Sequence, residues 1–170
     1  MLLSLLFFSH NVYAVPGWQS WANGSFIPKE SMHVIHQRRE QAKAETLDAS
    51  NFLVRNLATS KLDEKPYICA QYDFEAKGTV LKVTCDDRGS ISINLNGEPT
   101  EYKKPDGTTL NVVAKVDGSQ VTQTFVGESG GLKVVYLFSQ EGVLVTKSIS
   151  SSYLGKALTV DVFYRLKELE

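Results

Sequence analysis

The sequence lacks an excess of charge of either sign, because its 170 residues carry 18 basic and 19 acidic side chains, a formal net charge of −1. Nucleic-acid binding relies on a basic surface, so we expect no nucleic-acid partner. No run of about 18 apolar residues occurs, which predicts no transmembrane span. With 12 Gly, 5 Pro and 42% hydrophobic residues, the composition is typical of a single globular domain.

Motifs of catalysis and of metal binding are scarce as well. The sequence contains no phosphate-binding Gly-rich loop and no His-Glu-x-x-His. Four residues at helical spacing are the candidates for a metal site: Glu30, His33, His36 and Glu40. Natural helix-borne sites draw ligands from several helices, so we interpret these four as a solvated, mixed-charge face. We therefore expect no enzyme, no catalytic residue, no metal and no cofactor.

The first fourteen residues have the pattern of an export signal. Leu2 to Phe8 form a short apolar core, and Val12 and Ala14 occupy the −3 and −1 positions of a plausible cleavage site. The pattern predicts a signal peptide at residues 1–14, a mature chain from Val15, and a location in the periplasm or outside the cell. The alternative is that residues 1–14 form a buried strand or helix.

Two cysteines test the expectation of export independently. Cys69 and Cys85 flank a segment typical of a hairpin, with strands at 67–75 and 79–86 joined by a three-residue loop. In that register Glu75 pairs with Thr79, and Cys69 falls directly opposite Cys85. Cross-strand Cβ atoms are about 4.5–5.5 Å apart, near the range of a disulfide. We therefore predict a structural disulfide, which an oxidising compartment would preserve.

The organisation of the chain changes near Pro66. Residues 15–65 are predicted to form a helical segment, with helices at about 28–45 and 50–60. Residues 66–170 are predicted to form an antiparallel β-barrel domain, because apolar and polar residues alternate there between short turn signals. We expect eight strands, at about 67–75, 79–86, 90–95, 108–116, 119–127, 132–139, 143–150 and 157–167. Such a meander closes into an up-and-down barrel, with a two-layer β-sandwich as the alternative.

The best-defined hairpin is centred on Asp117-Gly118, a sequence typical of a two-residue primed turn. Pairing Val116 with Ser119 places alternate residues of both strands on one apolar face, which fixes the register. The residues predicted to face inward here are Leu110, Val112, Ala114, Val116, Val121, Gln123 and Phe125.

The strands resemble the small lipocalin-like barrels of the calycin group, as found among exported bacterial proteins. The resemblance covers residues 67–167 and rests on Asn96-Gly97, Pro105-Asp106-Gly107, Asp117-Gly118, Glu141-Gly142 and the last strand Val162-Phe163-Tyr164-Arg165. The lipocalin signature is Gly-x-Trp on the first strand, with a late Arg packed across the Trp. Gly17, Trp18 and Arg165 are the candidates here, with Gly17 and Trp18 adjacent. The resemblance implies an apolar ligand or lipid inside the barrel.

A barrel of eight strands is just wide enough to hold one small ligand or to be filled by side chains. The residues predicted to contact a ligand are Val112, Ala114, Val121, Gln123, Phe125, Tyr136, Phe138, Val162 and Tyr164. We expect no charged anchor for a carboxylate among the inward residues. The alternative is a filled core, in a non-enzymatic envelope interaction or inhibitor module. A protein partner would then contact Trp18, Trp21 and Phe26, although we favour packing of these aromatic residues against the barrel.

Overall fold

The computed structural model describes residues 17–63, 65–103, 107–127 and 130–168. The expected signal peptide at residues 1–14 lies outside this part of the chain. Within it, neither helix is long and apolar enough to cross a membrane.

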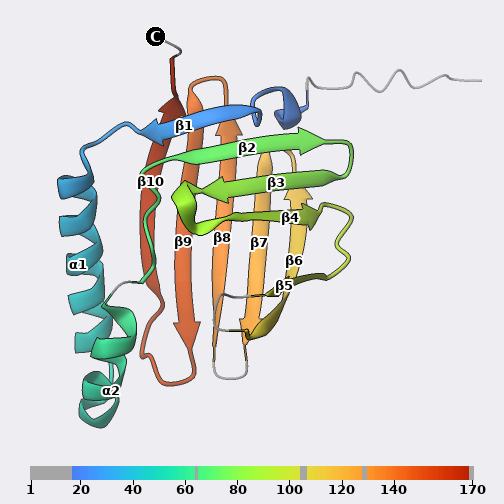
Figure 1. Cartoon of the computed structure of the whole chain (residues 1–170). Coiled ribbons are helices and arrows are strands. Elements are labelled where there is room, and N and C mark those ends of the chain that lie inside the picture. Colours follow the sequence, from blue (N-terminus) through green and yellow to red (C-terminus); the bar gives the residue numbers. More distant parts are fainter. Residues whose placement is uncertain (1–16, 64, 104–106, 128–129, 169–170) are drawn as a thin grey trace, which may run out of the picture.

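Ten antiparallel strands form one continuous sheet (Figure 1). They are β1 (Gly24–Pro28), β2 (Tyr72–Lys77), β3 (Val80–Cys85), β4 (Ser90–Asn94), β5 (Thr100–Lys103), β6 (Thr109–Asp117), β7 (Gln120–Gly127), β8 (Gly130–Ser139), β9 (Gly142–Ser151) and β10 (Leu158–Leu166). Their order is β4-β3-β2-β1-β10-β9-β8-β7-β6-β5. The first strand, β1, therefore lies between β2 and the last strand, β10, and pairs with both.

The sheet folds back on itself into two layers. Figure 1 shows β1 to β4 crossing in front of the longer strands β6 to β10. β4 and β5 are the two ends of the hydrogen-bonded order, although they approach each other in space. The result is a nearly closed barrel, which confirms the predicted fold in outline.

The strand count differs from the predicted eight because two short strands escaped the sequence pattern. β1 has five residues with Gly24 and Pro28 at its ends, and β5 has only four. Neither is long enough to show convincing alternation of apolar and polar residues. The segment before residue 66, expected to be only helical, therefore contributes a strand to the centre of the sheet.

Two helices connect β1 to β2, close to the predicted positions: α1 (Met32–Asp48) and α2 (Phe52–Leu62). Ser31 caps α1, since its side chain accepts a hydrogen bond from the Val34 amide. α1 packs beside β10, where Ile35 is fully buried and Arg38 donates to the carbonyl oxygen of Asp161 (Figure 1). On α2, Phe52 is 72% exposed.

The turn between the helices docks on the loop between β9 and β10. A Cβ at Gly155 would collide with the carbonyl oxygen of Ala49, so only glycine permits this approach. The Gly155 amide donates to the Ser50 hydroxyl, and Lys156 pairs with Glu45. Both helices are thereby held at the side of the barrel.

The predicted disulfide between Cys69 and Cys85 is present, but the predicted hairpin register is wrong. Lys77 pairs with Val80 across a two-residue turn, and Tyr72 lies opposite Cys85. β2 begins only at Tyr72, because residues 65–71 form an irregular segment, which we call the strap. Cys69 belongs to the strap, and the bond to Cys85 ties the strap to the end of β3.

The predicted register of the hairpin at Asp117-Gly118, between β6 and β7, is wrong by two residues. Val116 lies opposite Val121, and the turn residues are Gly118, with a φ of 58°, and Ser119. A shift of two residues leaves every side chain on its expected side. Of the predicted inward set, Val112, Ala114, Val121 and Gln123 are buried, whereas Val116, next to the turn, is 39% exposed.

Two of the three N-terminal aromatic residues lie in the core. Trp18 stacks on Phe138 with ring centroids 5.4 Å apart, and Phe26 meets Phe74 edge-on at 5.6 Å. Trp21 is partly buried against the same cluster. Trp18 and Phe26 are thus covered by the barrel and are not available to a protein partner. Arg165 is exposed on β10, so the lipocalin Arg–Trp pairing does not carry over to Trp18.

Candidate functional site

The inner face of β6 to β10 consists of rows of side chains that run across the strands. The row nearest the β9–β10 loop, which we call the mouth row, contains Val112, Phe125, Leu132, Ile149 and Leu158. The next, the polar row, contains Ala114, Gln123, Val134, Lys147 and Val160. Beyond it lies the aromatic end, with Val121, Tyr136, Val145 and Val162 in one row and Phe138, Val143 and Tyr164 in the last.

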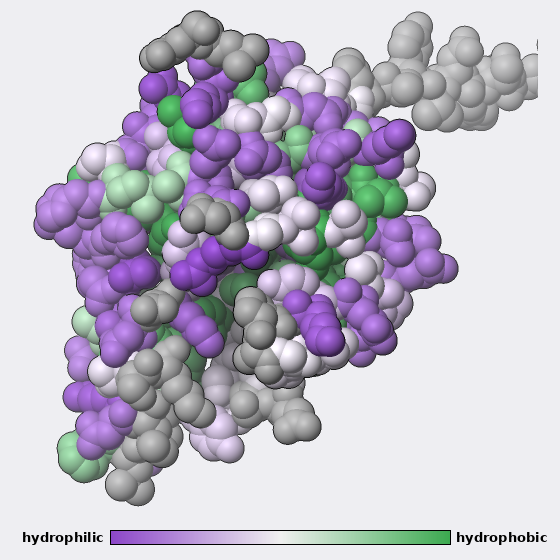
Figure 2. All heavy atoms as spheres, in the orientation of Figure 1, coloured by the Kyte–Doolittle hydropathy of each residue, from purple (hydrophilic) through white to green (hydrophobic). Residues whose placement is uncertain are grey.

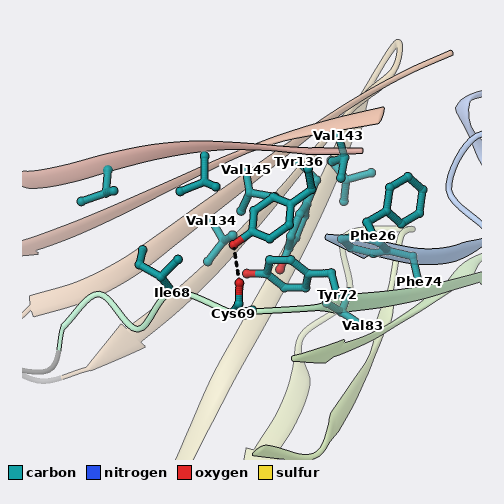
Figure 3. Close-up of a cluster of buried hydrophobic side chains, with 14 of the residues drawn as sticks. Phe26, Ile68, Cys69, Tyr72, Phe74, Val83, Val134, Tyr136, Val143 and Val145 are labelled. Atoms are coloured by element: carbon teal, nitrogen blue, oxygen red, sulfur yellow. Dashed lines mark hydrogen bonds between the residues drawn. The ribbon is translucent and has the colours of Figure 1, made fainter. Parts of the chain in front are cut away.

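The aromatic end is filled by side chains from both layers. Phe74 of β2 meets Phe138 of β8 edge-on at 5.2 Å between centroids, and Tyr72 meets Tyr164 of β10 at 4.9 Å. Figure 3 shows Tyr72, Phe74 and Tyr136 interleaved between the two layers. Edge-on aromatic pairs at these separations stabilise beyond the area they bury. The barrel is therefore closed at this end.

Gln123 is a buried amide with half of its hydrogen-bonding capacity unused. The residue is 1% exposed, and its Oε1 accepts a 2.8 Å hydrogen bond from the Tyr136 hydroxyl. Its Nε2 has no acceptor in the described part of the protein. An unpaired buried donor costs about 1–3 kcal/mol, so this position favours an acceptor that the chain itself does not provide.

Lys147 is the cation of the polar row. Its Nζ donates a 2.6 Å hydrogen bond to the carbonyl oxygen of Tyr67 and lies 3.6 Å from the Cys69 sulfur. The ring centre of Tyr72 is 5.4 Å away. Burial lowers the pKa of Lys147 from its usual 10.5 to about 8. No carboxylate of the described residues lies within ion-pair distance of this ammonium group.

The strap covers the polar row and is anchored to both layers. Tyr164 donates to the carbonyl oxygen of Cys69 at 2.9 Å, the bond drawn dashed in Figure 3. The Asp86 carboxylate accepts hydrogen bonds from the Tyr67 hydroxyl and from the amides of Ala70 and Gln71. Together with the disulfide, these bonds fix the backbone oxygen to which Lys147 donates.

The mouth row is apolar and incompletely covered. Phe125, Leu132 and Ile149 face inward but remain partly exposed, whereas Val112 and Leu158 are buried. Figure 2 shows hydrophobic surface in a hollow below the layer formed by β1 to β4. Two open hollows lie elsewhere, one lined by residues that include Tyr67 and Asp86 and the other by residues that include Ser25 and Lys82. The inner face is thus accessible from the mouth row.

All nine residues predicted to contact a ligand lie on this inner face. Val112 and Phe125 belong to the mouth row and Ala114 and Gln123 to the polar row. The other five form the filled aromatic end: Val121, Tyr136, Phe138, Val162 and Tyr164.

Lys147 was missed by the sequence analysis. The signal was present in the alternation of β9, where Val143, Val145, Lys147 and Ile149 share one face. Period-two alternation therefore places a charged side chain in the interior, against the expectation that no charged anchor faces inward.

The four candidates for a metal site, at residues 30–40, are not arranged as one in the described part of the chain. Arg38 pairs with Glu30, Arg39 pairs with Glu40, and His33 is exposed on α1. Among the described residues no group of three or more His, Cys, Asp or Glu is placed to hold a metal ion. A Gly-x-Ser-x-Gly pattern occurs at residues 127–131, but its Glu128 and Ser129 lie outside the described residues.

The sequence matches no protein-family profile and no curated protein. The structure is similar to a Schistosoma mansoni fatty-acid-binding protein in complex with arachidonic acid, at 16% identity and a TM-score of 0.56, over 89% of this chain and 100% of that one. It is similar to a secretory abundant heat soluble protein of Ramazzottius varieornatus, at 12% identity and a TM-score of 0.54, over 88% and 96%. A fatty-acid-binding protein of Drosophila melanogaster brain gives 16% identity and a TM-score of 0.51, over 85% and 98%. The chain therefore has the fold of a calycin-type β-barrel.

Proposed function

We propose that this protein binds a small amphipathic lipid with a carboxylate head, of the fatty-acid kind. The observation that carries the proposal is the polar row, where Lys147 and the Gln123 amide offer hydrogen-bond donors with no acidic partner among the described residues. A carboxylate is an acceptor with two oxygens and a negative charge, which complements both groups. The fatty-acid-binding proteins of similar fold support the same ligand class.

The apolar tail would lie along the mouth row. Phe125, Leu132 and Ile149 are apolar, face inward and remain partly exposed, so a hydrocarbon chain covering them removes apolar surface from water. Each buried methylene contributes about 0.8 kcal/mol, so affinity should rise with chain length until the hollow is filled. The aromatic end is already filled and would not accept the tail.

We also propose that the protein is exported from the cytoplasm. The apolar core and cleavage pattern of residues 1–14 support secretion, and the disulfide between Cys69 and Cys85 supports an oxidising compartment. We propose a non-enzymatic carrier that works outside the cytoplasm. Sequencing the N-terminus of the protein secreted from its own cells tests this, since a chain that still begins at Met1 would contradict it.

The binding test is displacement of cis-parinaric acid, a fluorescent fatty acid, by dodecanoate. Lys147→Met should weaken dodecanoate binding at least about tenfold, because a carboxylate would lose the cation of the polar row. Lys133→Met is the matched control, since Lys133 is exposed on the outer face of the neighbouring strand β8. Equal binding by both variants would show that the head does not lie at Lys147.

The filled aromatic end favours a second candidate, the interaction module with a filled core. Tyr72, Phe74 and Phe138 close one half of the barrel without any ligand. Native mass spectrometry of protein purified from its own cells separates the two functions. A mass excess of a few hundred daltons that denaturation removes supports the carrier. A bare mass, together with no binding of cis-parinaric acid, supports the interaction module.

A further inference from the structure

We infer that Lys147 is also a covalent attachment site, at which the amine condenses with the carbonyl carbon of an apolar aldehyde to form an imine. The inference rests on the proposed lipid site, because the same mouth row would hold the aldehyde's hydrocarbon chain. It adds an electrophilic ligand class to the carboxylic acids proposed above.

The surroundings of Lys147 favour an amine that reacts. Its neighbours across the strands are Val134 and Val160, both buried and apolar. The residue is partly exposed, and the neighbouring mouth row is apolar and incompletely covered. Its one strong hydrogen bond, to the Tyr67 carbonyl oxygen, leaves the amine free of any carboxylate of the described residues.

The charged and titratable groups around the amine do not hold it in the ammonium form. Asp86 attracts the positive charge, but its carboxylate is already bonded to the Tyr67 hydroxyl and to two backbone amides. Arg88, stacked 3.5 Å from the centre of the Tyr67 ring, repels it. Tyr72 and Tyr164 stay neutral, because burial raises the pKa of both phenols.

Burial lowers the pKa of Lys147 to about 8, which raises the share of the nucleophilic form. At pH 7.5 about a quarter of the side chain is then the free amine, against about 0.1% for a lysine at its usual 10.5. Desolvated lysines of this kind are the ones that form Schiff bases.

The reaction balances without an oxidant or a reductant. The nitrogen lone pair attacks the carbonyl carbon, the C=O electron pair moves to oxygen, and one of the two nitrogen protons passes to that oxygen to give a carbinolamine. The hydroxyl takes up a proton and departs as water while the nitrogen lone pair forms the C=N bond, and the nitrogen then releases its remaining proton, which replaces the one taken up. One amine and one aldehyde give one imine and one water.

Trapping with sodium cyanoborohydride tests the inference. Wild-type protein is incubated with one equivalent of decanal at pH 7.5, reduced, digested and mapped by mass spectrometry. We expect one decyl group per chain, mostly on Lys147, and loss of this preference when the protein is first unfolded in urea. Decanoate added in excess should reduce the labelling at least about fivefold, because both molecules would occupy one site.

Matched variants sharpen the result. Lys147→Arg should abolish the single adduct, whereas Lys133→Arg, on the outer face of β8, should leave it unchanged. Decyl groups scattered over the exposed lysines of wild-type protein would overturn the inference, and this outcome needs no variant to fold. Dodecanoate binding without a Lys147 adduct refutes the inference alone. An adduct without dodecanoate binding refutes the proposed acid ligand alone.

Discussion

At the aromatic end of the barrel, Phe138 is 1% exposed and touches rings from both layers. Four residues earlier on the same strand, Val134 belongs to the polar row, between Gln123 on one side and Lys147 on the other. The aromatic end is closed by contacts that the chain makes with itself. The polar row presents donors that the chain leaves partly unsatisfied.

The difference shows how one sheet can serve both stability and binding. Side chains of a β-strand alternate between faces, so a long strand crosses several rows and supplies one inward residue to each row that it crosses. β9 supplies Val143 and Val145 to the aromatic end, Lys147 to the polar row and Ile149 to the mouth row. Stability and the proposed binding are therefore separated by position along the strands rather than by different elements.

Truncating one phenylalanine in the aromatic end and one in the mouth row should give the largest contrast in unfolding free energy. Phe138→Ala should cost about 3–5 kcal/mol of unfolding free energy, because it removes a buried ring that packs on Trp18 and Phe74. Phe125→Ala should cost less than half as much, since Phe125 is partly exposed and Tyr102 is its one aromatic contact within the described residues. Urea unfolding followed by circular dichroism measures both.

Binding should reverse the order of these two variants. Phe125→Ala should weaken dodecanoate binding, while Phe138→Ala, measured where it is still folded, should leave the affinity within about twofold. Equal losses of stability for the two variants would mean that the mouth row is packed as tightly as the aromatic end, which would remove the basis for a ligand hollow.

The next-largest effect should be on the pH dependence of stability, to which Lys147 of the polar row and the phenols of the aromatic end contribute in opposite senses. The pKa of Lys147 is lowered in the folded protein to about 8, so between pH 8 and 10 the unfolded chain binds more protons. Lys147 therefore contributes a rise in stability with pH in this window, of about 2 kcal/mol for a pKa of 10.5 when unfolded. From about pH 9 the buried phenols act in the opposite sense, because Tyr136 and Tyr164 ionise more readily when unfolded.

Urea titrations at pH 8 and pH 10 measure this difference in wild-type protein and in Lys147→Met. The variant should lose the rise between the two pH values, whatever its stability at either one, because all other titrating groups are common to both proteins. An equal change between the two pH values in both proteins would show that Lys147 is solvated and titrates near its usual pKa.

The sequence was sufficient for the regular half of the fold. Alternation along 109–127 placed Val112, Ala114 and Gln123 inside even though the turn was misplaced, because an error of two residues preserves the face. In the first hairpin the error was three residues, an odd number, and the prediction that Cys69 lies within a strand was wrong. The disulfide forms nonetheless, because the strap brings Cys69 to the end of β3.

The strap explains why the site was harder to predict than the sheet. No periodic pattern marks an irregular segment whose position depends on Asp86, on Tyr164 and on a disulfide. The inward position of Lys147 follows from alternation, but its partner, the Tyr67 carbonyl oxygen, does not. Non-local contacts of this kind depend on the assembled barrel and leave no signature in the order of residues.

The smallest expected effect comes from the hydrogen bond between Tyr136 of the aromatic end and Gln123 of the polar row. Gln123→Leu leaves the Tyr136 hydroxyl without its acceptor, and Tyr136→Phe leaves the whole Gln123 amide unpaired, so each should cost about 1–2 kcal/mol. The double variant removes both groups and should be at least as stable as either single variant, a coupling of about 1 kcal/mol or more in a double-mutant cycle. The same double variant should bind dodecanoate more weakly, because the free Nε2 donor is gone. Additive losses of stability would instead show that water or another group already satisfies Gln123, and would remove the amide from the proposed site while leaving Lys147 in it.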